Sequence, residues 1–152
     1  MTRLLRTIAV AALPAAVALI GVATVASAQD AGWREIIMKQ MEAGGESLAK
    51  AGFSPTGPVY FGALNQGESI IVGVQLDAGK SYKIVGACDR ECKDLDIVLY
   101  DASGTVVDKD VEEDDVPIVE YRPSSTGKYR IEISMATCSA NPCHVGRRIF
   151  AN

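Results

Sequence analysis

The feature that most constrains the fold is a series of short apolar or alternating segments that runs from Val59 to Phe150. Each segment is rich in β-branched or aromatic residues, and glycine, proline or clustered acids, which favour turns, separate most of them. Short strands at roughly ten-residue spacing are typical of an antiparallel β-sandwich or barrel. No long helical pattern interrupts them, so a parallel α/β sheet is disfavoured. The eight predicted strands are residues 59–64, 69–76, 81–88, 95–101, 105–111, 116–122, 128–137 and 144–150.

Alternation within two of these segments predicts which side chains form the core. Successive side chains of a strand point to opposite faces, so an apolar residue at every second position marks the buried face. In 95–101 and 128–137 the intervening positions are mostly charged or polar. The predicted core residues are Leu95, Ile97, Leu99, Tyr129, Ile131, Ile133 and Met135.

The first 28 residues have the parts of a secretory signal peptide. Arg3 and Arg6 precede an apolar run from Ile8 to about Ala26, and the stretch ends in Ala26-Ser27-Ala28. A basic start, an apolar middle and an Ala-x-Ala ending favour cleavage after Ala28, which would place the protein in the periplasm or outside the cell. The alternative is an uncleaved membrane anchor, because the apolar run is nearly long enough to span a bilayer.

Cleavage would leave 124 of the 152 residues, enough for one domain with a substantial core. It would remove two arginines and no acids, so 13 basic and 19 acidic residues would remain, a net charge of −6. A negative surface disfavours binding to phosphate backbones, and only Arg147 and Arg148 are adjacent basic residues in this part of the chain. We therefore expect no nucleic-acid partner.

The four cysteines, Cys88, Cys92, Cys138 and Cys143, all lie in the part predicted to be exported. An even number of cysteines in an oxidising compartment predicts disulfides. The C-x3-C and C-x4-C spacings make the two local bridges the simplest pairing, but a pairing of 88 with 138 and 92 with 143 stays open. A zinc site or a redox pair is disfavoured, because C-x2-C pairs are absent and His144 is the only histidine.

Residues 29–52 are predicted to form an N-terminal helix, with Trp33, Ile37 and Met41 close to helical spacing. Asp30 is placed to cap its start and Gly52 to end it, and Gly44-Gly45 is expected to weaken or break its middle. The apolar stripe has two interpretations. Trp33, Ile37 and Met41 are candidate partner-binding residues, or the stripe covers the side of the domain. Residues 52–58, "GFSPTGP", are predicted to be a turn.

Three further segments carry a family resemblance: "LDAGKSYKI", "DLDIVLYDASG" and "TGKYRIEI". With the strands around them, residues 58–150 resemble the bacterial pre-peptidase C-terminal domain. The resemblance implies a jelly-roll-like antiparallel β-sandwich of about eight strands and a noncatalytic accessory role. Some members of that family bind calcium or an extracellular polymer. No peptidase precedes the domain here, which implies a standalone exported member.

The acidic residues define a candidate calcium site. Calcium takes six to eight oxygen ligands from several residues, and the acids near 94–96 and 108–115 would converge if their loops meet at one end of the sandwich. The spacing is not that of an EF-hand, since Glu113 stands where that loop needs glycine. The alternative is an acidic strand edge that prevents pairing with other chains. The candidate ligands are Asp94, Asp96, Asp108, Asp110 and Asp114.

Catalytic motifs are scarce. The sequence holds no G-x-S-x-G, H-E-x-x-H, P-loop or Rossmann glycine pattern. A small hydrolase would need His144, or carboxylates such as Asp94, Asp96 and Glu113 with a raised pKa, in a concave pocket. We therefore expect no enzyme activity and no resident cofactor other than the calcium considered above.

The expected function is a noncatalytic exported binding or accessory module with an extracellular protein or polysaccharide partner. One alternative is a calcium-dependent structural module. The other is an inhibitor or adaptor of a separately encoded exported enzyme, which would use the helix for recognition.

Overall fold

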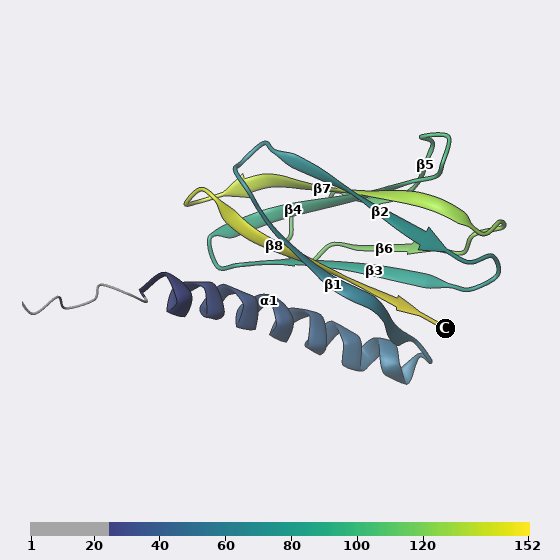
Figure 1. Ribbon diagram of the computed structural model, residues 1–152, viewed down its shortest axis with the longest axis horizontal. Coiled ribbons are helices and arrows are strands. Elements are labelled where there is room, and N and C mark those ends of the chain that lie inside the picture. Colours follow the sequence, from purple (N-terminus) through teal and green to yellow (C-terminus); the bar gives the residue numbers. More distant parts are fainter. Residues whose placement is uncertain (1–24) are drawn as a thin grey trace, which may run out of the picture.

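A computed structural model describes residues 25–152, with side chains described from residue 32 onward, and shows an antiparallel β-sandwich with one helix against it (Figure 1). One sheet has the strand order β1-β8-β3-β6 and the other β2-β7-β4-β5. This order is that of an eight-stranded jelly roll, so the predicted fold class is confirmed. The first sheet consists of β1 (Ser54–Leu64), β8 (Cys143–Ala151), β3 (Tyr82–Cys88) and β6 (Ile118–Tyr121). The second consists of β2 (Ser69–Leu76), β7 (Gly127–Cys138), β4 (Cys92–Tyr100) and β5 (Val106–Asp110).

The first strand begins earlier than predicted. β1 starts at Ser54, so the prediction of a turn over 52–58 is wrong for most of that stretch. Pro55 and Pro58 are tolerated because β1 lies at the edge of its sheet, where a missing N–H costs little. The pairing of β1 with β8 is irregular between Thr56 and Tyr60, so the strand bulges there before it resumes regular pairing.

The core between the sheets matches the predicted face assignment. Every residue of the predicted set in β4 and β7 is buried, and the polar residues between them are half-buried or exposed. The opposing sheet contributes Ile84, Val119, Val145 and Ile149 to the same cluster. Alternation was sufficient here because each strand has one face against the core and one face away from it.

Both predicted local disulfides are present. Cys88–Cys92 joins the end of β3 to the start of β4, and Cys138–Cys143 joins the end of β7 to the start of β8. Each bridge therefore closes a connection between the two sheets. Cys92 and Cys138 are paired across neighbouring strands, which places both bridges at the same end of the sandwich.

Helix α1 (Val25–Lys50) lies along the outer face of the β1-β8-β3-β6 sheet (Figure 1). It ends as predicted: Gly52 has a φ of 87°, and the N–H groups of Gly52 and Phe53 donate to the carbonyls of Ala49 and Leu48. Only a residue that accepts positive φ without strain suits this C-terminal cap. No helix among the described residues is long and apolar enough to cross a membrane.

Two other expectations about the helix are wrong. The helix starts at Val25, so Asp30 lies inside it rather than at its cap. The helix continues through the pair Gly44-Gly45. A Cβ on Gly45 would stand 3.1 Å from the Phe150 ring, so glycine at this position allows the helix to pack closely against β8. Tertiary contact overrides the weak helix propensity of glycine here. The predicted signal peptide, residues 1–28, falls mostly outside the described residues.

Candidate functional site

The two sides of the sandwich, where the edge strands of the two sheets face each other, are built differently. At one side the edge strands β5 and β6 are joined across the gap between the sheets. The carboxylate of Asp108 accepts a hydrogen bond from the Glu120 N–H at 2.6 Å, and that of Asp110 accepts one from the Ile118 N–H at 2.8 Å. Inward-pointing acids that satisfy edge amides are a means of preventing edge-to-edge pairing. This side of the sandwich is closed.

The predicted calcium ligands lie along this closed side. The two segments approach one another, because the Leu95 N–H donates a hydrogen bond to the Asp114 carbonyl at 2.9 Å. Burial raises the pKa of Asp94, with Glu113 and Asp114 acting in the same direction. Burial also raises the pKa of Asp96, supported by Asp94 and Asp110. The Asp114 carboxylate accepts a hydrogen bond from the Val116 N–H.

Three of the five proposed ligands, Asp108, Asp110 and Asp114, thus already accept backbone hydrogen bonds. Within residues 25–152 no group of three or more histidine, cysteine or acidic side chains is arranged to hold a metal ion. Calcium binding stays an untested alternative.

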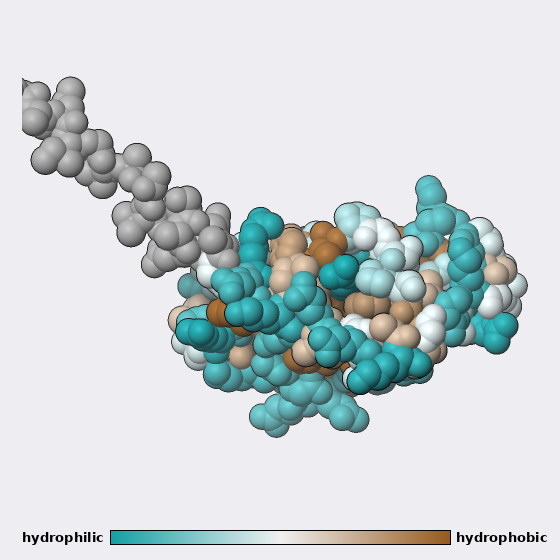
Figure 2. All heavy atoms as spheres, turned by 90° about the horizontal axis from the view of Figure 1, so that it is seen from below, coloured by the Kyte–Doolittle hydropathy of each residue, from teal (hydrophilic) through white to brown (hydrophobic). Residues whose placement is uncertain are grey.

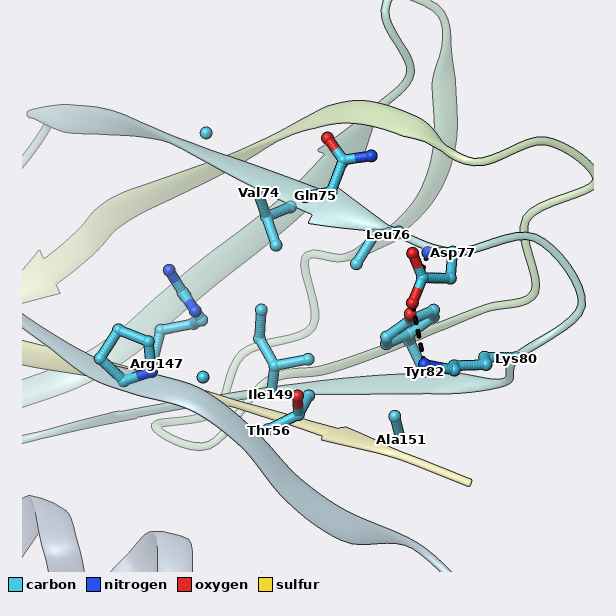
Figure 3. Close-up of a pocket in the computed structure, with 13 residues that line it drawn as sticks. Thr56, Val74, Gln75, Leu76, Asp77, Lys80, Tyr82, Arg147, Ile149 and Ala151 are labelled. Carbon is cyan, nitrogen blue, oxygen red and sulfur yellow. Dashed lines mark hydrogen bonds and ion pairs between the residues drawn. The ribbon is translucent and has the colours of Figure 1, made fainter.

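The opposite side contains a cavity of about 350 Å³ between β1, β8 and β2 (Figure 3). β1 and β2 are consecutive strands that belong to different sheets, so they diverge after the turn that joins them. The β1 bulge contributes Gly57 and Pro58 to the cavity wall. Val74 and Leu76 point into the cavity from β2, whereas Gln75 between them points away (Figure 3).

Arg147 of β8 points into this cavity from the opposite sheet (Figure 3). It occupies an interior position, with Val145 and Ile149 two residues before and after it on the same face of β8. Its side chain is only 6% exposed. Within the described part of the chain its guanidinium forms no hydrogen bond or ion pair, and its Nε is buried without a partner.

Burial lowers the pKa of Arg147 from its ordinary value. Tyr60, which lies opposite Arg147 in the pairing of β1 with β8, raises this pKa by a smaller amount. A buried cation without a counter-ion is costly, because desolvation is not offset by pairing. An anion that enters the cavity would supply the missing partner. Among the described side chains, three others also have a buried polar atom without a partner: Gln40, Asp89 and Asp94. Of the four residues, Arg147 is the one that lines this cavity.

The far end of the cavity is polar. Lys80 Nζ lies 2.8 Å from Asp77 Oδ2, so these two charges neutralise each other. The Tyr82 hydroxyl accepts a hydrogen bond from the Asp77 N–H at 2.9 Å and lines the cavity beside the pair. The cavity thus has a cationic end, an apolar middle formed by Val74, Leu76 and Ile149, and a polar end whose two charges are paired (Figure 3).

Arg147 was missed by the reasoning from sequence, although the signal was present. The segment 144–150, "HVGRRIF", alternates so that Val145, Arg147 and Ile149 share a face. An arginine in an apolar row is a conflict between residue type and position, and such conflicts mark functional sites. The adjacency of Arg147 and Arg148 bears only on nucleic-acid binding, whereas the alternation places the two side chains on opposite faces of the strand.

A second polar cluster lies where the disulfides are. Asp89 is only 4% exposed. Its Oδ2 accepts a hydrogen bond from the backbone N–H of His144 at 2.7 Å, and the same oxygen lies 2.9 Å from Nδ1 of the His144 ring. The His144 ring stacks on Trp33 of α1, with the ring centroids 4.3 Å apart. A histidine–aspartate pair could act as a general base, but in the described residues no hydroxyl or thiol is hydrogen-bonded to His144.

The helix residues proposed for partner binding divide into two groups. Ile37 and Met41 are fully buried with Ala87 against the sheet, so neither is available on the surface, and their assignment to a recognition face is wrong. Trp33 is partly buried and lines a pocket with Asp89 and His144. Seen from the α1 side, the surface is mainly hydrophilic with small separate hydrophobic areas (Figure 2). The apolar stripe covers the sandwich, as the other interpretation predicts.

Comparison with known proteins leaves the family unassigned. No protein-family model and no curated protein matches the chain, so the resemblance to the pre-peptidase C-terminal domain stays a prediction. The chain is similar to the solved structure of PliG from Aeromonas hydrophila, a periplasmic lysozyme inhibitor of g-type lysozyme. The TM-score is 0.44 at 10% sequence identity, and the match covers 62% of this chain and 83% of that chain. At this level of similarity it carries no argument about function.

Proposed function

We propose that this protein is a noncatalytic exported binding module and that its ligand carries an anionic group bound by Arg147. The observation that carries the proposal is the Arg147 side chain in an open cavity: it is 6% exposed, its Nε is buried without a partner, and its guanidinium forms no ion pair within the described residues. A side chain of this kind lowers the stability of the ligand-free protein. This loss of stability is offset when a bound anion pairs with the guanidinium.

The scaffold around the cavity supports binding by a preformed site. Asp108 and Asp110 join the sheets at the opposite side, and the two disulfides join them at one end. A site held in its binding conformation loses little conformational entropy when the ligand enters. The cavity is also at the lower end of the size range of ligand-binding pockets.

The lining of the cavity supports binding rather than catalysis. Its one carboxylate, Asp77, is paired with Lys80, and neither histidine nor cysteine lines it. A general base or an activated nucleophile would require such groups. The disulfides support export, because bridges of this kind persist in oxidising compartments. An extracellular protein or polysaccharide remains the expected source of the anionic group.

Two adjacent arginines allow a matched test. Arg147→Met removes the cavity charge, while Arg148→Met removes the same charge from the α1 side of β8, where the Arg148 guanidinium lies 5.8 Å from the Phe150 ring centroid. Each variant is isolated from the native host and its bound small molecules or partners are identified by native mass spectrometry. We expect the wild type and Arg148→Met to retain an anionic ligand that Arg147→Met lacks.

The same variants have a second measurement. In ligand-free protein, Arg147→Met should be more stable than the wild type, by on the order of 1–3 kcal/mol, because a buried unpaired charge is replaced by an apolar side chain. A loss of ligand together with a gain of stability separates a binding residue from a structural one. If Arg147→Met is destabilised and retains the same ligand, the proposal is wrong.

A further inference from the structure

We infer that the anionic group recognised in the cavity is a single carboxylate attached to a small apolar body. This inference rests on the proposed function, because it specifies the chemistry of the ligand that Arg147 binds. It draws on three properties of the cavity: its charge, the shape of its cation, and the residues of its wall.

The charge of the cavity matches a monoanion. Its charged side chains are Arg147, Lys80 and Asp77, and the Lys80–Asp77 pair is closed at 2.8 Å. One uncompensated positive charge remains, on Arg147. A carboxylate balances it, whereas a phosphate dianion would leave one negative charge without a partner in a site that also contains Asp77.

The guanidinium also suits a carboxylate by its shape. Its planar fork of N–H donors matches the two oxygens of a carboxylate in a bidentate pair. Because Arg147 forms no hydrogen bond or ion pair within the described chain, no existing pair has to break first. Thr56 of β1 lines the same cavity opposite Ile149.

The middle of the cavity, between Arg147 and the polar end at Asp77, is apolar. Val74 and Leu76 face Ile149 across the gap between the sheets (Figure 3). A cavity of about 350 Å³ is at the lower end of the size range of ligand-binding pockets. The ligand group that enters is therefore small, with an apolar chain or ring behind its carboxylate.

The test is a titration with defined probes, followed by calorimetry and by the melting temperature. The probes are sodium acetate, butanoate and hexanoate, with hexyl phosphate and hexylamine at matched chain length. We expect hexanoate to bind most tightly of the five. Across the carboxylate series each added methylene should strengthen binding about fourfold, as expected for burial of apolar surface. Arg147→Met should lose this binding at least tenfold, and Arg148→Met should keep it.

The outcomes separate this inference from the proposed function. If hexyl phosphate binds as tightly as hexanoate and both depend on Arg147, the anion site stands and the carboxylate inference fails. If the carboxylate series shows no dependence on chain length, the apolar body is wrong. If no anion binds, or if Arg147→Met binds hexanoate like the wild type, both fail.

A further comparison identifies where the carboxylate comes from. A tripeptide that ends in leucine with a free carboxylate is compared with the same peptide ending in an amide. Tighter binding of the free peptide than of hexanoate, lost on amidation, would identify the source as the end of a polypeptide chain. Binding of hexanoate without binding of the free peptide would identify a small organic acid. Binding of the amidated peptide as tightly as the free one would overturn the carboxylate inference.

Discussion

Gly146 of β8 lies so close to Ile37 of α1 that a Cβ on Gly146 would stand 2.5 Å from Ile37 Cγ2. Met41 Cε would be 2.8 Å away from the same position. The helix therefore packs on the sheet at a distance that only glycine allows. This contact explains why the apolar stripe of α1 is part of the fold.

The first prediction concerns this contact. Gly146→Ala should destabilise the protein by about 1–3 kcal/mol, because the added methyl group overpacks the interface between helix and sheet. Denaturant unfolding measures the change. Gly44→Ala is the control: no atom lies within 4 Å of its Cβ position, so better helix propensity should stabilise the protein by about 0.5–1 kcal/mol. Equal effects of the two substitutions would contradict the close packing.

The second prediction concerns the disulfides. Replacing Cys88 and Cys92 together by serine should lower the free energy of unfolding by about 2 kcal/mol, the loop-closure value for a bridge of this short span, which is four residues. The pair Cys138 and Cys143, five residues apart, should give a similar loss. Thiol titration of the unreduced, unfolded wild type should detect no free cysteine. Reactive thiols in that sample would show that the bridges are absent.

The third prediction concerns pH. Burial raises the pKa of Asp96, with Asp94 and Asp110 acting in the same direction, so ionised Asp96 is disfavoured in the folded protein. This penalty is complete above the folded pKa and is relieved as pH falls toward the unfolded pKa of about 3.9. Asp96→Asn should therefore melt higher than the wild type at pH 7, and the difference should shrink toward pH 4.

A neighbouring acid provides a control of opposite sign. Hydrogen bonds from Ser103, and then from the Thr105 N–H, lower the pKa of Asp101. Its contribution to stability is present above the unfolded pKa and is lost as pH falls through the folded one. Asp101→Asn should melt lower than the wild type at pH 7, with a difference that shrinks in acid. The same sign for both variants would count against this account.

The fourth prediction concerns calcium. Because Asp108, Asp110 and Asp114 already accept backbone hydrogen bonds, we expect millimolar calcium to leave the melting temperature unchanged relative to magnesium. A rise that is specific for calcium, reversed by chelation and absent in Asp96→Asn, would instead establish the calcium-dependent structural module.

Much of the scaffold was predictable from local sequence, and the exceptions have physical causes. β2 spans Ser69–Leu76, the predicted 69–76, because its ends coincide with turn residues. The start of β1 was missed because Pro55 and Pro58 signal a turn locally, and only the position at a sheet edge makes them acceptable in a strand. The predicted break at Gly44-Gly45 failed because Phe150, about a hundred residues away, packs against Gly45.

The sequence by itself determined the class of fold and the inward face of strands such as β4 and β7, because alternation is a local property of a strand. Only the tertiary structure decided the roles of Arg147, Ile37 and Asp108. Whether a charge is paired, an apolar side chain covered or an acid bonded to an edge amide depends on which distant segment lies opposite. Arg147 remains without a partner because β1 and β2 diverge where it points, and this divergence is a property of the assembled sheets.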